Sequence, residues 1–135
     1  MMQKLCDESW NPEVQVINNW LGDLDARGFV GRVERLDVDV IWWNSFDYLP
    51  DLSFEERKQF FRWGLGAVLR EGRARLEDVN GFWGGTVDEQ IERFMAAWPP
   101  ELDWDPDMFW VAKPGYGWVP GGFVWKLEDG SYFSP

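Results

Sequence analysis

Ser53-Phe-Glu-Glu-Arg-Lys-Gln-Phe-Phe-Arg-Trp-Gly-Leu-Gly-Ala-Val-Leu-Arg70 is the stretch of sequence with the strongest local folding signal. It opens with a capping box, in which the side chains of Ser53 and Glu56 each accept a hydrogen bond from the backbone N–H of the other residue. Gly72 follows as a left-handed stop, so the stretch predicts a helix to about Arg70. Its apolar face, read from helical spacing, consists of Phe54, Phe61, Leu65 and Val68.

The opposite face of this helix is expected to carry the basic residues Arg57, Lys58 and Arg62. Inside the helix, Gly64-Leu-Gly66 is similar to a fragment of a nucleotide-binding loop. A nucleotide loop needs a preceding strand and a Gly-Lys-Ser/Thr ending, and the sequence has neither here. The two glycines are therefore interpreted as packing positions.

A second capping box, Thr86-Val-Asp-Glu89, predicts another helix that Pro99-Pro100 terminates. Between the two helices, Arg73-Ala-Arg-Leu76 alternates polar and apolar residues and predicts a short strand.

The segment before Ser53 gives weaker signals. Asn11-Pro12 is a typical helix start, and a basic last turn at Arg27 followed by Gly28 predicts a helix over 12–27. Residues 29–36 are expected to form a short strand or a connection. Residues 37–49 fit either a helix that ends at Pro50 or a strand through 38–43, and the pattern leaves both open. The apolar stripe of the first helix comprises Val14, Ile17, Leu21 and Leu24.

The C-terminal part has a different character. Residues 109–112, 117–119 and 123–127 predict short strands, and Glu128-Asp-Gly130 turns the last of them into a hairpin with residues 131–133. The expected class is α+β, in which a helical N-terminal two thirds packs with a small antiparallel C-terminal sheet or hairpin. The length of 135 residues fits a single domain, 1–135.

Composition excludes several classes of function. The chain has no histidine and one cysteine, Cys6, so Ser-His and Cys-His catalysis, imidazole–zinc sites and an intrachain disulfide are excluded. The net charge of −11 argues against direct binding of nucleic acid or anionic membranes. No secretory signal or membrane-spanning run is recognisable, which predicts a cytoplasmic protein. We expect no cofactor, no metal and no enzymatic activity.

The acidity is concentrated in one region. Residues 76–107 hold nine acidic side chains against one basic side chain, Arg93, and aromatic residues are interleaved with them. Such a run is usually a solvated face, but aromatic anchors beside a field of one sign also suit a charge-steered protein interface. The candidate partner-binding residues are Glu77, Asp78, Trp83, Asp88, Glu92, Glu101, Asp103, Trp104, Asp105 and Asp107.

Acidic residues of the chain also have the spacing of two other kinds of site, a calcium loop and a glycosidase pair. Asp103, Asp105 and Asp107 have the spacing that begins a calcium loop, but the loop's later glycine and glutamate are missing. Paired carboxylates such as Glu55/Glu56 and Asp88/Glu89 could serve a glycosidase. Both pairs lie in first helical turns, where acids complete capping boxes and interact with the helix dipole, so the structural interpretation is preferred.

The eleven tryptophans divide by position. Those in predicted helices are expected in the core: Trp20, Trp42, Trp63 and Trp98. Those in predicted loops are expected to be exposed: Trp83, Trp104 and Trp118.

Several stretches carry a family resemblance: Asp47-Tyr-Leu, Glu71-Gly-Arg-Ala-Arg-Leu, Gly81-Phe-Trp-Gly-Gly, Ala97-Trp-Pro-Pro and Val124-Trp-Lys-Leu-Glu-Asp-Gly. Over residues 37–133 the chain resembles a family of small bacterial proteins of unknown function associated with polymorphic-toxin loci. The resemblance implies an immunity-like protein. It supplies no active residues.

Composition and resemblance together predict a non-enzymatic binding protein, an immunity protein that neutralises a cognate bacterial toxin through an acidic, aromatic-rich surface. The expected partner is a basic toxin domain, because an acidic protein can occupy or block a basic substrate groove. Two alternatives stay open: a carbohydrate-binding or carboxylate-dependent hydrolytic domain, and a structural or regulatory partner of a larger assembly.

Overall fold

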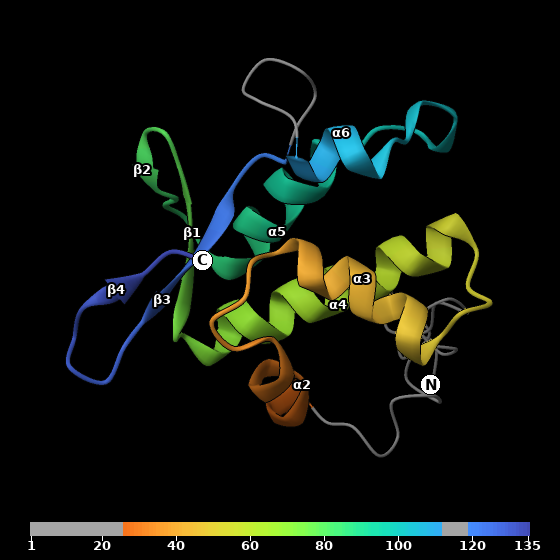
Figure 1. Ribbon diagram of the computed structural model, residues 1–135. Helices are drawn as coiled ribbons and strands as arrows, with labels where there is room; N and C mark the ends of the chain where they lie inside the picture. The colour runs from red at the N-terminus through yellow and green to blue at the C-terminus, as the bar shows by residue number, and fades with distance from the viewer. Residues whose placement is uncertain (1–25, 112–118) are drawn as a thin grey trace, which may run out of the picture.

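The computed structural model describes residues 26–111 and 119–135, which form an α+β arrangement of helices and a small antiparallel sheet (Figure 1). The four-stranded sheet has the order β2-β1-β3-β4. The α-helices are α2 (Ala26–Val33), α3 (Asp39–Tyr48), α4 (Phe54–Glu71), α5 (Val87–Ala96) and α6 (Pro106–Val111), with a 3₁₀ turn, η3 (Glu101–Asp103). The strands are β1 (Ala74–Asp78), β2 (Gly81–Phe82), β3 (Gly122–Lys126) and β4 (Tyr132–Phe133). The predicted fold class is confirmed.

Both predicted capping boxes are present. At the start of α4, Ser53 N–H donates to Glu56 Oε1 at 2.9 Å and Glu56 N–H donates to Ser53 Oγ at 3.1 Å. Thr86 and Glu89 make the same reciprocal pair at the start of α5. Gly72 ends α4 with φ 89°, a conformation that costs glycine little because it has no Cβ. The two strongest local signals therefore determine the two helices as predicted.

The prediction for residues 28–33 is wrong. Helix α2 runs through Gly28 to Val33, so Gly28 is not a stop and residues 29–33 are helical. Residues 34–36 form a connection, one of the two alternatives that the sequence left open. Phe29, Val30 and Val33 recur at helical spacing and are all buried, which favours helix over strand. The remainder of the predicted helix, residues 12–25, lies outside the described residues.

Residues 37–49, which the sequence left open, form helix α3. Its buried face, Ile41, Trp42 and Ser45, follows helical spacing, and Ser45 Oγ donates to Trp42 O at 2.5 Å. Gly64 of α4 lies against this helix, since a Cβ at that position would be 2.6 Å from Ile41 Cγ2. The packing interpretation of Gly64 is therefore confirmed.

The predicted strand at 109–112 is wrong, because residues 106–111 form the short helix α6. Asp105 Oδ1 accepts a hydrogen bond from Asp107 N–H at 3.0 Å, and Pro106 stands at the first helical position, a placement that proline favours. Of the predicted strand 117–119, only Val119 lies within the described residues. It is outside the sheet and donates its N–H to Phe109 O at 2.6 Å.

The sheet joins two distant parts of the sequence. The strands predicted at 73–76 and 123–127 are confirmed and pair with each other, with Leu76 opposite Phe123. The predicted terminal hairpin is also confirmed, since β4 pairs with β3 through Trp125 and Lys126. Where β4 ends, a loop covers the edge of β3: Asp37 Oδ1 accepts the N–H of Phe123 at 3.0 Å.

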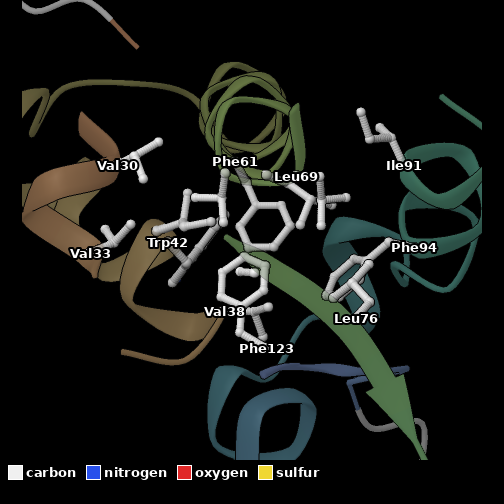
Figure 2. Packing of buried hydrophobic residues seen from close by; sticks show 14 of the residues in the cluster. Val30, Val33, Val38, Trp42, Phe61, Leu69, Leu76, Ile91, Phe94 and Phe123 are labelled. Atoms are coloured by element: carbon white, nitrogen blue, oxygen red, sulfur yellow. The ribbon is translucent and has the colours of Figure 1, made fainter. Parts of the chain in front are cut away.

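Apolar side chains from helices and sheet meet in a contiguous core (Figure 2). Phe61 of α4 and Phe94 of α5 pack with rings 5.2 Å apart. Leu76 and Phe123 bring the inner face of the sheet to the same cluster. None of the helices in the described part of the chain is long and apolar enough to cross a membrane.

Candidate functional site

The ten candidate residues fall into two groups in the structure. Five lie on β1, on α5 or in the loop between them, and most of these have partners within the protein. The other five lie in the segment from η3 to α6, at the far end of α5 from the sheet (Figure 1). The two groups differ in burial and in ion pairing. Three of the four acids in the first group form salt bridges, whereas none of the acids in the second group forms one with the described residues.

Asp78 has a structural role. Its carboxylate accepts hydrogen bonds from Asn80 N–H at 2.7 Å, Trp83 Nε1–H at 3.0 Å and Arg93 at 3.1 Å. These donors, the backbone N–H of Asn80 first, lower the pKa of Asp78 below its ordinary value. Asp78 therefore closes the β1–β2 turn. Its neighbour Glu77 is half-buried within β1 and pairs across the strands with Phe82 and Gly122.

Trp83 is buried, with 4% of its surface exposed, so the expectation of an exposed loop tryptophan is wrong. The ring packs 6.3 Å from Phe94, and the Arg93 guanidinium lies 3.8 Å above its face. The β1–β2 hairpin turns the chain so that residue 83 faces the core. A ring covered in this way is not available to a partner.

Asp88 and Glu92 of α5 are exposed but paired. Asp88 forms a salt bridge with Arg70, and Glu92 forms one with Arg62, both from α4. The hydrogen bond from Arg62 lowers the pKa of Glu92 below its ordinary value. The linear count of charge over 76–107 missed these arginines because they lie outside that window. Packing of α4 against α5 offsets part of the acidic run.

The remaining acids form what we call the acidic tip, residues 101–108. Glu101, Asp103, Asp105 and Asp107 are all exposed, and no salt bridge joins them to any lysine or arginine in residues 26–111 or 119–135. Two apolar side chains stand among them: Leu102 is 98% exposed and Met108 is 44% exposed. Sequence reasoning missed both. A leucine placed between acids in a turn after Pro99-Pro100 is a signal that could have identified Leu102.

Trp104 is the residue of the acidic tip whose ring packs against the core. Its ring stacks on Trp98 at 5.0 Å and 7°, and also lies 5.0 Å from Trp42 and 5.1 Å from Phe109. The residue is half-buried, so the expectation of an exposed ring is wrong. Trp42 and Trp98 are core residues as predicted, whereas Trp63 is half-buried. Trp20 and Trp118 lie outside the described residues.

The aromatic cluster beneath the tip holds buried indole donors. Trp42, Trp98 and Trp110 each bury an Nε1–H that has no acceptor among the described residues. An unpaired buried donor costs about 1–3 kcal/mol, so the cluster is held by ring packing rather than by hydrogen bonds.

The structure gives little support to the other candidate sites, which are the calcium loop, the glycosidase pair and the nucleotide loop. No group of three or more potential metal ligands occurs in the described residues, and Asp105 of the calcium-like spacing instead caps α6. Glu56 and Glu89 are engaged in capping boxes, as the structural interpretation predicted. Gly66 lies inside α4, where a Cβ would meet Ile91 Cδ1 at 3.3 Å.

The prediction for Arg57 is also wrong. It was expected to face away from the core, but only 4% of it is exposed. Its guanidinium donates to Ser45 Oγ at 2.9 Å and to the carbonyl oxygens of Leu49 at 3.2 Å and Leu52 at 3.1 Å. Burial lowers its pKa from the ordinary value. Arg57 therefore fastens the α3–α4 connection.

Comparison with known proteins identifies a similar fold but no function. No curated protein matches the chain. A solved structure, of an uncharacterized protein conserved in bacteria from Neisseria meningitidis, is 25% identical and superposes with a TM-score of 0.66. The match covers 98% of this chain and 97% of that one. Residues 69–134 match the model of a family described as a protein of unknown function, DUF596, so this half of the chain is similar to that family.

Proposed function

We propose that this protein is a non-enzymatic binding protein of the cytoplasm that neutralises a bacterial toxin, as an immunity protein does, and that the acidic tip is its contact surface. The observation that supports the proposal is the arrangement at residues 101–108. Four exposed acids lack an ion-pair partner in the described residues, and the almost fully exposed Leu102 lies between two of them, Glu101 and Asp103, in the sequence.

The chemistry of the tip suits a basic partner. Unpaired surface carboxylates raise the rate of encounter with a positively charged groove, while charges already paired within the protein contribute little to that field. An exposed leucine among these acids can enter a pocket on the partner and lose its contact with water, which supplies affinity that charge alone does not. The expected partner is therefore a toxin domain with a basic substrate groove.

The acidic tip is also anchored to the core. Trp104 packs against both Trp98 and Phe109, so the backbone from η3 to α6 is anchored to the core on its inner side. A surface held in its binding conformation loses less conformational entropy when a partner docks. The half-buried Trp104 is therefore expected to hold the surface in its binding conformation without contacting the partner itself.

The test is co-purification of the full chain with the product of the adjacent gene, followed by charge reversal. Glu101→Lys, Asp103→Lys and Asp107→Lys together are expected to weaken binding at least tenfold, mostly through a slower association rate. Binding by the unmodified protein should weaken as salt rises. The matched control is Asp47→Lys, Asp51→Lys and Glu128→Lys, three exposed acids outside the tip.

An acidic partner, or binding that is insensitive to salt, would contradict the steering argument. Loss of binding in the control variant to the same extent would show that net charge, and not the tip, determines the affinity. Leu102→Asp adds a second test, because it should slow association little and speed dissociation.

A further inference from the structure

A groove runs across the outer side of α4, between α2 and α5. It consists of two adjoining cavities of about 360 Å³ and 300 Å³, which share Ala26, Ala67 and Arg70 in their linings. Trp63, Ala67 and Ile91 supply apolar surface, while Arg62 and Arg70 stand at its rim beside the α5 acids that they pair with. The groove is separate from the acidic tip.

The position of Ala26 connects the groove to the beginning of the sequence. Ala26 is the first residue of α2 and lines both cavities. In the sequence, 25 residues precede it. Any segment just before Ala26 is therefore tethered at the mouth of the groove, and a short tether gives an effective concentration on the order of millimolar. A separate peptide would have to compete with that concentration.

The preceding sequence has the chemistry that the groove requires. Val14, Ile17 and Leu21 recur at helical spacing. Asp23 and Asp25 follow Gly22, which allows a turn, and they precede Arg27 at the rim of the second cavity.

We propose that the groove between α2 and α5 binds residues 12–21 of the same chain, with the apolar stripe against Trp63, Ala67 and Ile91 and the acids of 23–25 toward the arginines at the rim. The groove is thus an intramolecular docking site, and the partner-binding surface of the protein lies elsewhere. This inference is independent of the proposed toxin partner, because it rests on the groove and the tether alone.

The test is photo-crosslinking in the full chain. A benzoylphenylalanine at Gln59, a half-buried residue that lines the first cavity, should crosslink to residues 12–21 within one molecule. The same group at Val79, which is 82% exposed in the β1–β2 turn, is the matched control and should not reach that segment. Mass spectrometry of the crosslinked peptides identifies the occupant.

Mixed isotopically labelled and unlabelled chains distinguish the outcomes. Crosslinks between labelled and unlabelled molecules would show that a second copy fills the groove and would overturn the proposal, as would an absence of crosslinks to residues 12–21.

A second measurement does not depend on the photo-reactive group. Leu21→Lys should speed amide hydrogen exchange of residues 12–21 at least tenfold, whereas Asn19→Lys, the same charge change on the opposite side of the predicted helix, should leave it nearly unchanged. Equal effects of the two substitutions would overturn the proposal.

Discussion

Asp39 shows what burial does to a single carboxylate in this protein. It lies in the first turn of α3, where burial, followed by the nearby charge of Asp37, raises its pKa above the ordinary value of 3.8. Hydrogen bonds that the carboxylate accepts, including one from the Trp43 side chain, oppose the shift without cancelling it. Because the charged form is disfavoured in the folded state, Asp39 lowers stability once pH rises through its folded pKa.

The substitution Asp39→Asn is therefore expected to stabilise the protein at pH 7. Below the unfolded-state pKa the carboxyl group is neutral in both states, so the advantage should vanish near pH 3. Urea unfolding at the two pH values measures it, with Asp47→Asn, an exposed acid of the same helix, as the control. An advantage of Asp39→Asn that persists unchanged at low pH would contradict the electrostatic explanation.

Arg57 and Trp83 show that the burial of a single residue cannot always be predicted from its type. Arginine is seldom buried without a carboxylate partner, yet Arg57 is satisfied by carbonyl oxygens at the end of α3 and in the connection that follows. Trp83 looked exposed because its neighbours Gly84 and Gly85 indicate a loop. In both cases the partners lie on neighbouring elements or in turns, outside the helix or loop pattern from which the expectation was read.

Among the elements, α4 and α5 were predictable because their signals are local. Capping boxes and the Gly72 stop act within a few residues, and tertiary contacts do not need to reinforce them. Helices α2 and α6 were missed for the opposite reason. Phe29, Val30 and Val33 are recognisable as a helix only once their burial is known, and the sequence around Asp105 fits an acidic surface run as well as a helix cap.

Capping at Ser53 makes a quantitative prediction. Ser53→Ala removes the acceptor for Glu56 N–H and is expected to cost about 1 kcal/mol of unfolding free energy. Ser53→Asp keeps an acceptor at the same place and should cost much less. Chemical denaturation of the three proteins measures both. If Ser53→Asp loses as much stability as Ser53→Ala, the capping explanation is wrong.

For the whole molecule, one core joins the helices to the sheet. Leu76 of β1 is fully buried and packs in the same cluster as Phe61 and Phe94. Strand β1 directly follows α4, but its main partner, β3, lies more than 40 residues further along the chain. The helical and the sheet parts should therefore unfold together, as a single domain does.

Leu76→Ala tests this cooperativity. Removing a fully buried leucine is expected to cost about 2–5 kcal/mol, and the loss should appear equally in far-UV circular dichroism, which follows the helices, and in tryptophan fluorescence. Val79→Ala, at an exposed position, is the control and should change stability by less than about 0.5 kcal/mol. Two separate transitions would show that helices and sheet are distinct units.

The distribution of charge is also a property of the whole molecule. The sequence predicted an acidic surface over 76–107. In the structure, packing of α4 on α5 pairs Asp88 and Glu92 with arginines of α4, and Arg93 of α5 pairs with Asp78 of β1. The candidate surface is thereby reduced to the tip at 101–108. Charge counted along a chain ignores neighbours in space, and for this reason only part of the candidate site was predictable.

The sequence by itself determined the α+β class, the two capped helices, the central and C-terminal strands and the acidic character of the protein. Each of these depends on signals within a few residues or on composition alone. Only the tertiary structure decided that residues 29–33 and 106–111 are helical, that β1 pairs with β3, and which acids remain unpaired. Those features depend on contacts between residues far apart in the sequence, whose free energy appears only when the surfaces meet.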